Sequence, residues 1–333
     1  MNGDGGRDGS MKMEEIRKML VFMWGYLPGA LPKRSPLLVA GLVKLGAGCS
    51  WKDVCGGGCG FAMAISDSGK LITWGSTDDL GQSYVTSGKH GETPEPFPLP
   101  TEATVVKAAA GWAHCISVTE SGEVHMWEWK ECVPSGKSKR ALALRDRDLV
   151  VEQCLVWMVE EVERRLQSIG VRIATVAAGW RHTLALSDVG SAALSCGSLS
   201  SEEQGFRVPG NYVMGIACGG RHSAVITDAG ALPTFGWGLY GQCGHGTETL
   251  PRLLDAPSLE NIHAKIVFCG ACHSALITEN GKVFCWGWNK YGQHGLGDVI
   301  DRNIPSQVAI DGCISKNVAC GWWHTLLLAE SPT

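Results

Sequence analysis

The chain has 333 residues, of which 44% are hydrophobic and 19% are charged, with a formal net charge of −4 at pH 7. This composition is typical of a folded globular chain, and the negative charge lends only weak support to nucleic-acid binding through phosphate neutralisation. No apolar run reaches about 18 residues, so the sequence predicts no membrane span.

The N-terminal segment is polar and rich in glycine, beginning Asn2-Gly3-Asp4-Gly5-Gly6. It lacks the apolar core of a signal sequence and any helical or strand pattern. We therefore expect residues 1–15 to form a disordered tail and residues 16–330 to form a single domain.

A phrase of ten to twelve residues then recurs six times along the chain, starting at Gly58, Gly111, Gly179, Gly219, Gly270 and Gly321. Its fourth position is Phe61 in the first copy and histidine in the others, namely His114, His182, His222, His273 and His324. Such self-similarity indicates one supersecondary unit that stacks against copies of itself. Because a catalytic histidine would be needed only once, we interpret these five as structural residues that form hydrogen bonds between strands or neighbouring units.

Each unit contains a β-hairpin signal. The β-rich runs 274–278 and 283–287 lie on either side of the turn Glu279-Asn280-Gly281-Lys282, and Asn-Gly between two such runs is typical of a tight hairpin. The last three copies start 51 residues apart, which is long for a pair of helices. The sequence therefore predicts an all-β protein, a β-propeller of small antiparallel sheets.

The two ends of the chain complement each other. The sixth copy ends near Glu330 without a partner strand, and Leu20 to Gly25 looks like the strand that is missing. We expect this N-terminal strand to close the ring.

The spacing between the second and third copies is longer than elsewhere, which indicates an insert over residues 133–170. Within it, Val151, Leu155, Met158, Val162 and Leu166 recur at three- and four-residue steps. This periodicity predicts an amphipathic helix over residues 148–167.

The fourteen cysteines do not indicate a disulfide scaffold, because Cys218, Cys269 and Cys320 occupy one repeat position. We interpret these three as small buried residues of a reduced chain. The spacing of Cys269 and Cys272 could suit zinc, but this pair of cysteines occurs in only one of the six copies, so we expect no metal site.

The extended phrase, Gly-x-x-His-[Ser/Thr] followed by Trp-Gly-x-Asn-x-x-Gly-Gln-x-Gly, resembles the repeat of the regulator of chromosome condensation family. It is most complete from His273 to Gly281 and from Trp286 to Gly295. The resemblance implies a propeller of seven blades, whereas six motifs are visible here. The segment from Trp24 to Gly29 is similar to plant single-propeller nuclear members linked to cold tolerance, which are related to the plant ultraviolet-B photoreceptor.

The resemblance implies a nuclear or chromatin-associated regulatory protein, with the cytoplasm as a second location, that acts as a non-enzymatic scaffold for protein partners. We see no catalytic constellation and expect no cofactor. Two alternatives stay open: guanine-nucleotide exchange on a small nuclear GTPase, and ultraviolet-B sensing.

Candidate partner-binding residues are those at which the copies differ. They lie at the two positions that follow the first motif glycine and are aromatic or arginine: Trp112, Trp180, Arg181, Arg221, Trp322 and Trp323. Clusters of aromatic residues with arginine are typical of binding hot spots. The phrase Gly-Trp-Arg-His-Thr at Trp180 also resembles the tryptophan and arginine motif of the plant photoreceptor.

Overall fold

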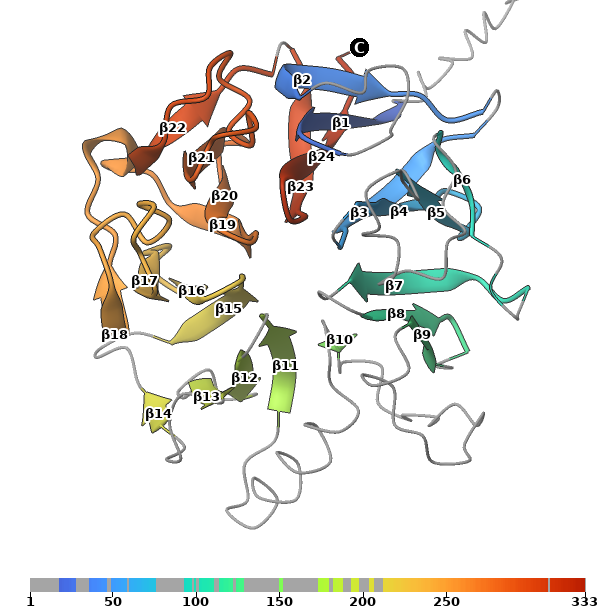
Figure 1. Ribbon diagram of the computed structural model, residues 1–333. Coiled ribbons are helices and arrows are strands. Elements are labelled where there is room, and N and C mark those ends of the chain that lie inside the picture. The colour runs from blue at the N-terminus through green and yellow to red at the C-terminus, as the bar shows by residue number, and fades with distance from the viewer. Residues whose placement is uncertain are drawn as a thin grey trace, which may run out of the picture.

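The computed structural model describes residues 18–27, 36–46, 49–58, 60–75, 93–97, 99, 102–110, 114–121, 124–128, 150–151, 173–179, 182–187, 193–197, 204–206, 212–310 and 312–332. Nearly all of the regular structure in these ranges is β-strand, arranged as six sheets in a ring (Figure 1). None of the helices in this part of the chain has the length and apolar character to cross a membrane.

Five of the sheets follow one another along the chain. The first consists of β3 (Trp51–Gly56), β4 (Ala62–Ser66), β5 (Leu71–Trp74) and β6 (Glu95–Pro96), and the second of β7 (Val105–Ala110), β8 (His114–Thr119) and β9 (Val124–Glu128). The third consists of β10 (Val150–Val151), β11 (Ile173–Ala178), β12 (His182–Ser187), β13 (Ala193–Gly197) and β14 (Gln204–Phe206). The fourth consists of β15 (Val213–Cys218), β16 (His222–Thr227), β17 (Pro233–Gly236) and β18 (Glu248–Leu253), and the fifth of β19 (Ala264–Cys269), β20 (His273–Thr278), β21 (Val283–Gly287) and β22 (Arg302–Val308). A short 3-10 turn, η2 (Pro257–Leu259), precedes β19.

The sixth sheet joins the two ends of the described chain. Its order is β2 (Leu37–Val43), β1 (Met19–Gly25), β24 (His324–Glu330) and β23 (Ile314–Cys320). Strand β1 pairs antiparallel with β24 from Met19 opposite Glu330 to Gly25 opposite His324. The predicted pairing of the N-terminal strand with the last repeat is confirmed.

The glycine that ends the third strand of a unit is required by its surroundings. Gly287 has a φ of 104°, and a Cβ there would lie 2.6 Å from the carbonyl oxygen of Cys272. A side chain is therefore excluded both by the backbone conformation and by the neighbouring strand. The same environment recurs at Gly25, Gly75 and Gly236.

The hydrophobic core lies between adjacent sheets. One cluster joins Ile277 and Cys285 of one sheet to Trp24, Val318 and Leu327 of the next. The tryptophans that precede the strand-ending glycines, Trp24, Trp74 and Trp286, are at most 1% exposed. These two sheets thus bury the faces that they turn toward each other, as a stacked repeat requires.

The predicted helix over residues 148–167 is wrong at its start. Val150–Val151 form β10, which pairs parallel with β11, Val150 opposite Thr175 and Val151 opposite Val176. Two β-branched residues in sequence favour the extended backbone, and the edge of β11 offers them hydrogen-bond partners. The rest of the predicted helix and insert, like the predicted tail, lies outside the described residues.

Candidate protein-binding face

The motif histidines of two neighbouring units join adjacent sheets through a side-chain relay. Nε2 of His273 lies 3.1 Å from Oγ1 of Thr325, and this hydroxyl donates to the carbonyl oxygen of Gln293 at 3.0 Å. The indole N–H of Trp24 donates to the same carbonyl at 2.7 Å. One sheet earlier the relay recurs with His222, Ser274, Gln242 and Trp286.

The relay fixes the tautomer of the imidazole. Because the single O–H of Thr325 donates its hydrogen bond to the Gln293 carbonyl, the hydroxyl oxygen can only accept a hydrogen bond from Nε2–H of His273. A neutral imidazole with its proton on Nε2 meets this need, and burial lowers the pKa of His273 well below its usual range. This arrangement supports a structural role for the repeated histidine.

His324 is the exception. Its Nε2 is buried without a hydrogen-bond partner. The next sheet carries Phe61-Ala62 where the sheets that receive the other two relays carry His273-Ser274 and His324-Thr325, so the hydroxyl is missing. Burial lowers the pKa of His324 to about 4. The other two motif histidines, His114 and His182, are the first residues of β8 and β12, and their side chains lie outside the described part.

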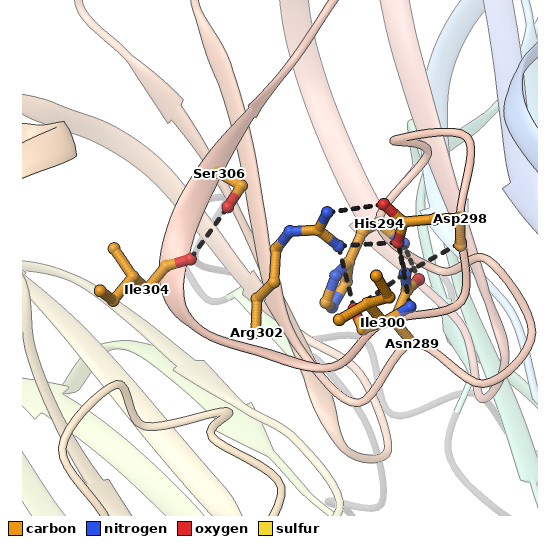
Figure 2. Close-up of polar contacts among 7 residues, drawn as sticks. All are labelled: Asn289, His294, Asp298, Ile300, Arg302, Ile304 and Ser306. Atoms are coloured by element: carbon orange, nitrogen blue, oxygen red, sulfur yellow. Dashed lines mark hydrogen bonds and ion pairs between the residues drawn. The ribbon is translucent and has the colours of Figure 1, made fainter.

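The loop after β21 is held by buried polar groups (Figure 2). The side-chain carbonyl of Asn289 accepts from the backbone N–H of His294 at 2.9 Å, and its amide donates to the Asp298 carbonyl at 3.0 Å. Asp298 forms an ion pair with Arg302 at 2.6 Å, which holds the pKa of its carboxyl at about 2. Burial is the main cause that lowers the pKa of His294 to about 3. This frame fixes the backbone on which the exposed residues of the loop stand.

A repeated backbone bond places an aromatic residue at the start of each such loop. The N–H of Trp288 donates to the Cys272 carbonyl at 2.9 Å, immediately before the motif histidine. The same bond joins Trp237 to Arg221 at 2.8 Å and Tyr26 to Trp323 at 2.7 Å. The strand-ending glycine makes this close approach possible.

The result is a continuous aromatic row on one face of three neighbouring sheets. In spatial order it consists of Trp237, Tyr240, Trp288, Tyr291, Trp323 and Trp322, with successive ring centroids 5.3–5.9 Å apart. Tyr26 packs beside the row, 5.3 Å from Tyr291 and 6.2 Å from Trp323. The guanidinium of Arg221 stands 5.5 Å from the ring centroid of Trp237. These rings are partly exposed, and Leu239 beside them is 71% exposed.

Three of the residues predicted from the sequence to bind partners belong to this surface: Arg221, Trp322 and Trp323. The other three, Trp112, Trp180 and Arg181, lie outside the described residues. Sequence reasoning missed Trp237, Tyr240, Trp288, Tyr291 and Tyr26, because they stand inside phrases that we assigned to the scaffold. A usable signal was present: Trp237 and Trp288 follow the strand-ending glycine, and Tyr240 and Tyr291 precede the Gly-Gln turn.

No group of three or more histidine, cysteine or acidic side chains in the described ranges could hold a metal ion. Cys218, Cys269 and Cys320 are buried, and burial raises the pKa of the Cys269 and Cys320 thiols. Protonated, buried thiols are poor nucleophiles, so these cysteines serve packing rather than chemistry. What the described surface offers is an aromatic face suited to binding.

Six small, mostly antiparallel sheets arranged in a ring define the molecule as a β-propeller. Residues 264–293 and 280–328 match the regulator of chromosome condensation (RCC1) repeat. The chain is therefore an RCC1-like propeller, similar to the propellers built from this repeat.

Among curated proteins, it is 33% identical to the ultraviolet-B receptor UVR8 of Arabidopsis thaliana over 299 residues, 82% of this chain and 62% of the receptor. It is 28% identical to the human E3 ubiquitin-protein ligase HERC2 over 283 residues, 80% of this chain and 6% of the ligase. The chain thus spans less than two thirds of these relatives.

Solved structures share the fold. Human WBSCR16 superposes with a TM-score of 0.65 at 20% identity, covering 95% of this chain and 100% of that one. Prp20p of Saccharomyces cerevisiae superposes with a TM-score of 0.57 at 17% identity, covering 96% of this chain and 93% of Prp20p.

Proposed function

We propose that this propeller is a non-enzymatic scaffold that binds protein partners through the aromatic row. The carrying observation is the unbroken series of partly exposed rings, from Trp237 to Trp322, on loops fixed by buried polar groups. Rigid aromatic rings bury a large area at little entropic cost, and tryptophan and tyrosine, together with arginine, are enriched in binding hot spots.

The proposal extends to a nuclear or chromatin-associated role. Its support is the repeat family and the fold shared with Prp20p, a protein studied for its binding to Gsp1p and histones. Localisation of a fluorescently tagged full chain tests this part, and exclusion from the nucleus would contradict it.

Capture of partners from nuclear extract tests the binding proposal. The double variant Trp237→Ala with Trp323→Ala should lose partners that the unaltered chain retains, while its melting temperature stays within a few degrees. Lys282→Ala, on the hairpin at the other end of β21, is the surface control. Unchanged capture by the double variant would remove the aromatic row from the function.

A second candidate function is guanine-nucleotide exchange, favoured by the fold shared with the Gsp1p-binding Prp20p. The full chain, mixed with a nuclear GTPase loaded with labelled GDP, should then accelerate nucleotide release. An unchanged release rate would eliminate this candidate and leave the scaffold proposal intact.

Ultraviolet-B sensing is a third candidate, favoured by the 33% identity to the plant receptor and by Trp322 and Trp323, whose rings lie 5.7 Å apart. Ultraviolet-B irradiation followed by size measurement tests it. A size that does not change with light would count against it.

A further inference from the structure

The outer strands of the four-stranded sheets differ in how their free edges are protected. These strands are β2, β6, β18 and β22, each at the end of its sheet that lies on the rim of the ring (Figure 1). Three of them carry a proline together with a charged residue: Glu95 and Pro96 in β6, Pro251 and Arg252 in β18, and Arg302 and Pro305 in β22. Proline lacks a backbone donor and a charge is costly to bury, so both hinder pairing with another chain. The remaining strand, β2, carries neither.

β2 is a seven-residue aliphatic strand with one exposed side. Its side chains are all aliphatic or glycine. Leu37, Ala40 and Val43 pack against the core clusters of the ring, whereas Val39 is 60% and Leu42 is 48% exposed. A long aliphatic edge strand that is held in place by the core is a template for a further strand.

Part of the outer edge of β2 is already in use. The Leu38 carbonyl accepts from the backbone N–H of Gly297 at 2.7 Å, and Val39 forms a β-bridge with Leu296. The other edge of β2 is taken by β1, and no strand in the described ranges pairs with the outer edge over residues 40–43. The open edge therefore covers these four residues.

The aliphatic surface continues on the loop that flanks this edge. Val299 and Ile300 follow Leu296 by three and four residues and are 53% and 63% exposed. The ion pair between Asp298 and Arg302 holds this loop, and the Ile300 N–H donates to the Asp298 carboxylate at 2.9 Å (Figure 2). An approaching surface would therefore meet aliphatic side chains that are already fixed in position beside the open backbone.

We propose that β2 pairs antiparallel with β2 of a second copy of this chain, with the two-fold axis at Leu42. An axis at this residue sets the open segment against itself, so that Leu42 lies opposite its own copy and Gly41 lies opposite Val43. The pairing brings aliphatic side chains together, with the small Gly41 opposite a β-branched residue, and opposes no two charges. Two four-stranded sheets would become one continuous sheet across the dimer.

A single extended aliphatic segment of another protein is the competing occupant. Such a segment would cover the edge of β2 and leave its own far edge open. Two copies of β2 cover each other's open edges in one contact. The position of β2 on the rim also lets two rings meet side by side (Figure 1). These two properties favour the second copy.

The dimer goes beyond the scaffold function and has a consequence for it. Pairing through residues 40–43 uses no residue of the aromatic row, so the dimer would present two rows. A partner with two binding segments would then bind more tightly than a partner with one, because its second segment binds intramolecularly.

Sedimentation equilibrium of the full chain tests the inference. We expect twice the mass of one chain at about 100 μM and dissociation on dilution, as for a dimer with a micromolar dissociation constant. A chain that is still monomeric at about 100 μM would overturn the proposal.

A charge swap at the axis tests where the contact lies. Leu42→Glu and Leu42→Lys each set two like charges opposite each other, so the dissociation constant of each variant alone should rise at least about tenfold. A mixture of the two variants should form a heterodimer, because opposite charges then face each other, and this rescue also shows that both variants are folded. Unchanged dimers of either variant, or a mixture that stays monomeric, would overturn pairing at Leu42.

Leu253 provides the matched control. It is a leucine on the outer strand β18 and is 55% exposed, and its strand already carries Pro251 and Arg252. Leu253→Lys should leave the dimer unchanged. An equal loss for Leu253→Lys and Leu42→Lys would show a non-specific charge effect and overturn the assignment.

The dimer and the binding face can fail separately. Trp237→Ala with Trp323→Ala should lose partner capture and keep the dimer. Loss of the dimer in this double variant would place the contact on the aromatic row and overturn pairing through β2. If the double variant captures partners normally and stays dimeric, the aromatic row leaves the scaffold function and the pairing of β2 stands.

Discussion

The repeated histidine is a joint between sheets rather than a reactive group. Nε2–H of His273 donates a hydrogen bond to the Thr325 hydroxyl of the next sheet, and that hydroxyl donates to the Gln293 carbonyl. A chain of donors and acceptors in a buried setting is expensive to interrupt, because the remaining groups cannot reach water.

This difference between His273 and His324 leads to a paired prediction. His273→Phe should lower the free energy of unfolding by about 1–3 kcal/mol, because Thr325 loses its donor. His324→Phe should cost less, because its Nε2 has no partner and Phe61 already occupies the equivalent position in the next unit. Urea unfolding at neutral pH measures both, and equal costs would refute the relay as the source of the difference.

The missing hydroxyl can be supplied. Ala62→Ser places a hydroxyl at the position that Ser274 and Thr325 occupy in their units, and by analogy with their contacts to His222 and His273 we expect it to reach the unpaired Nε2 of His324. The expected gain is about 1 kcal/mol of stability. Ala62→Val, which adds volume without a donor or acceptor, is the control. A serine variant no more stable than the valine variant would show that the hydroxyl does not reach the imidazole.

Buried neutral histidines also make stability depend on pH. The pKa values of His273, His294 and His324 are all lowered by burial, to about 3 for His294 and about 4 for His324. Below the ordinary histidine pKa of about 6.5 the unfolded chain therefore binds more protons than the folded one, so stability falls as pH falls.

We predict constant stability above about pH 7 and a loss approaching ~1.4 kcal/mol per pH unit for each such histidine on acidification below about pH 6. His324→Phe should remove the contribution of one histidine to this loss. Between pH 7.5 and pH 5 the free energy of unfolding of the variant should therefore fall less than that of the unaltered chain. Denaturant unfolding of both proteins at the two pH values tests this prediction. An equal loss of unfolding free energy in the two proteins would contradict the assignment of His324 as a neutral buried group.

At the scale of elements, ring closure depends on one strand. β1 lies between β2 and β24, so its removal would expose one edge of each. Deleting residues 1–26 should therefore cause unfolding or aggregation, whereas deleting residues 1–12 should leave the melting temperature unchanged. Equal melting temperatures for the longer deletion and the full chain would refute closure by β1.

The elements were largely predictable because they depend on local signals. The turn around Gly281, the tryptophan and glycine at 286–287, and the strand-like Leu20 to Gly25 can each be interpreted within about ten residues. The short strand β10 was not predictable, because the same residues fit an amphipathic period and only pairing with β11 selects the strand.

At the scale of the whole molecule, the aromatic row exists only through the ring. Trp237 and Trp288 are 51 residues apart in sequence, as are Tyr240 and Tyr291, so no local window contains their contacts. The sequence predicted Arg221, Trp322 and Trp323 as surface candidates because the copies differ there. It could not show that rings from neighbouring units touch, since that depends on how far each sheet is rotated from the next.

Tyr26 connects closure to the row. It occupies the position of Trp237 and Trp288 in a unit assembled from both ends of the chain, and β1 delivers it to Tyr291 and Trp323. We predict that Tyr26→Ala weakens partner capture by about 1–2 kcal/mol, because the ring that packs against Tyr291 and Trp323 is lost. The melting temperature should barely change, since the backbone bond from residue 26 is kept and the ring is partly exposed. Tyr26→Phe, which keeps the ring, is the control and should bind as the unaltered chain does. If Tyr26→Ala melts early and binds normally once folded, the residue belongs to the closure of the ring and not to the binding face.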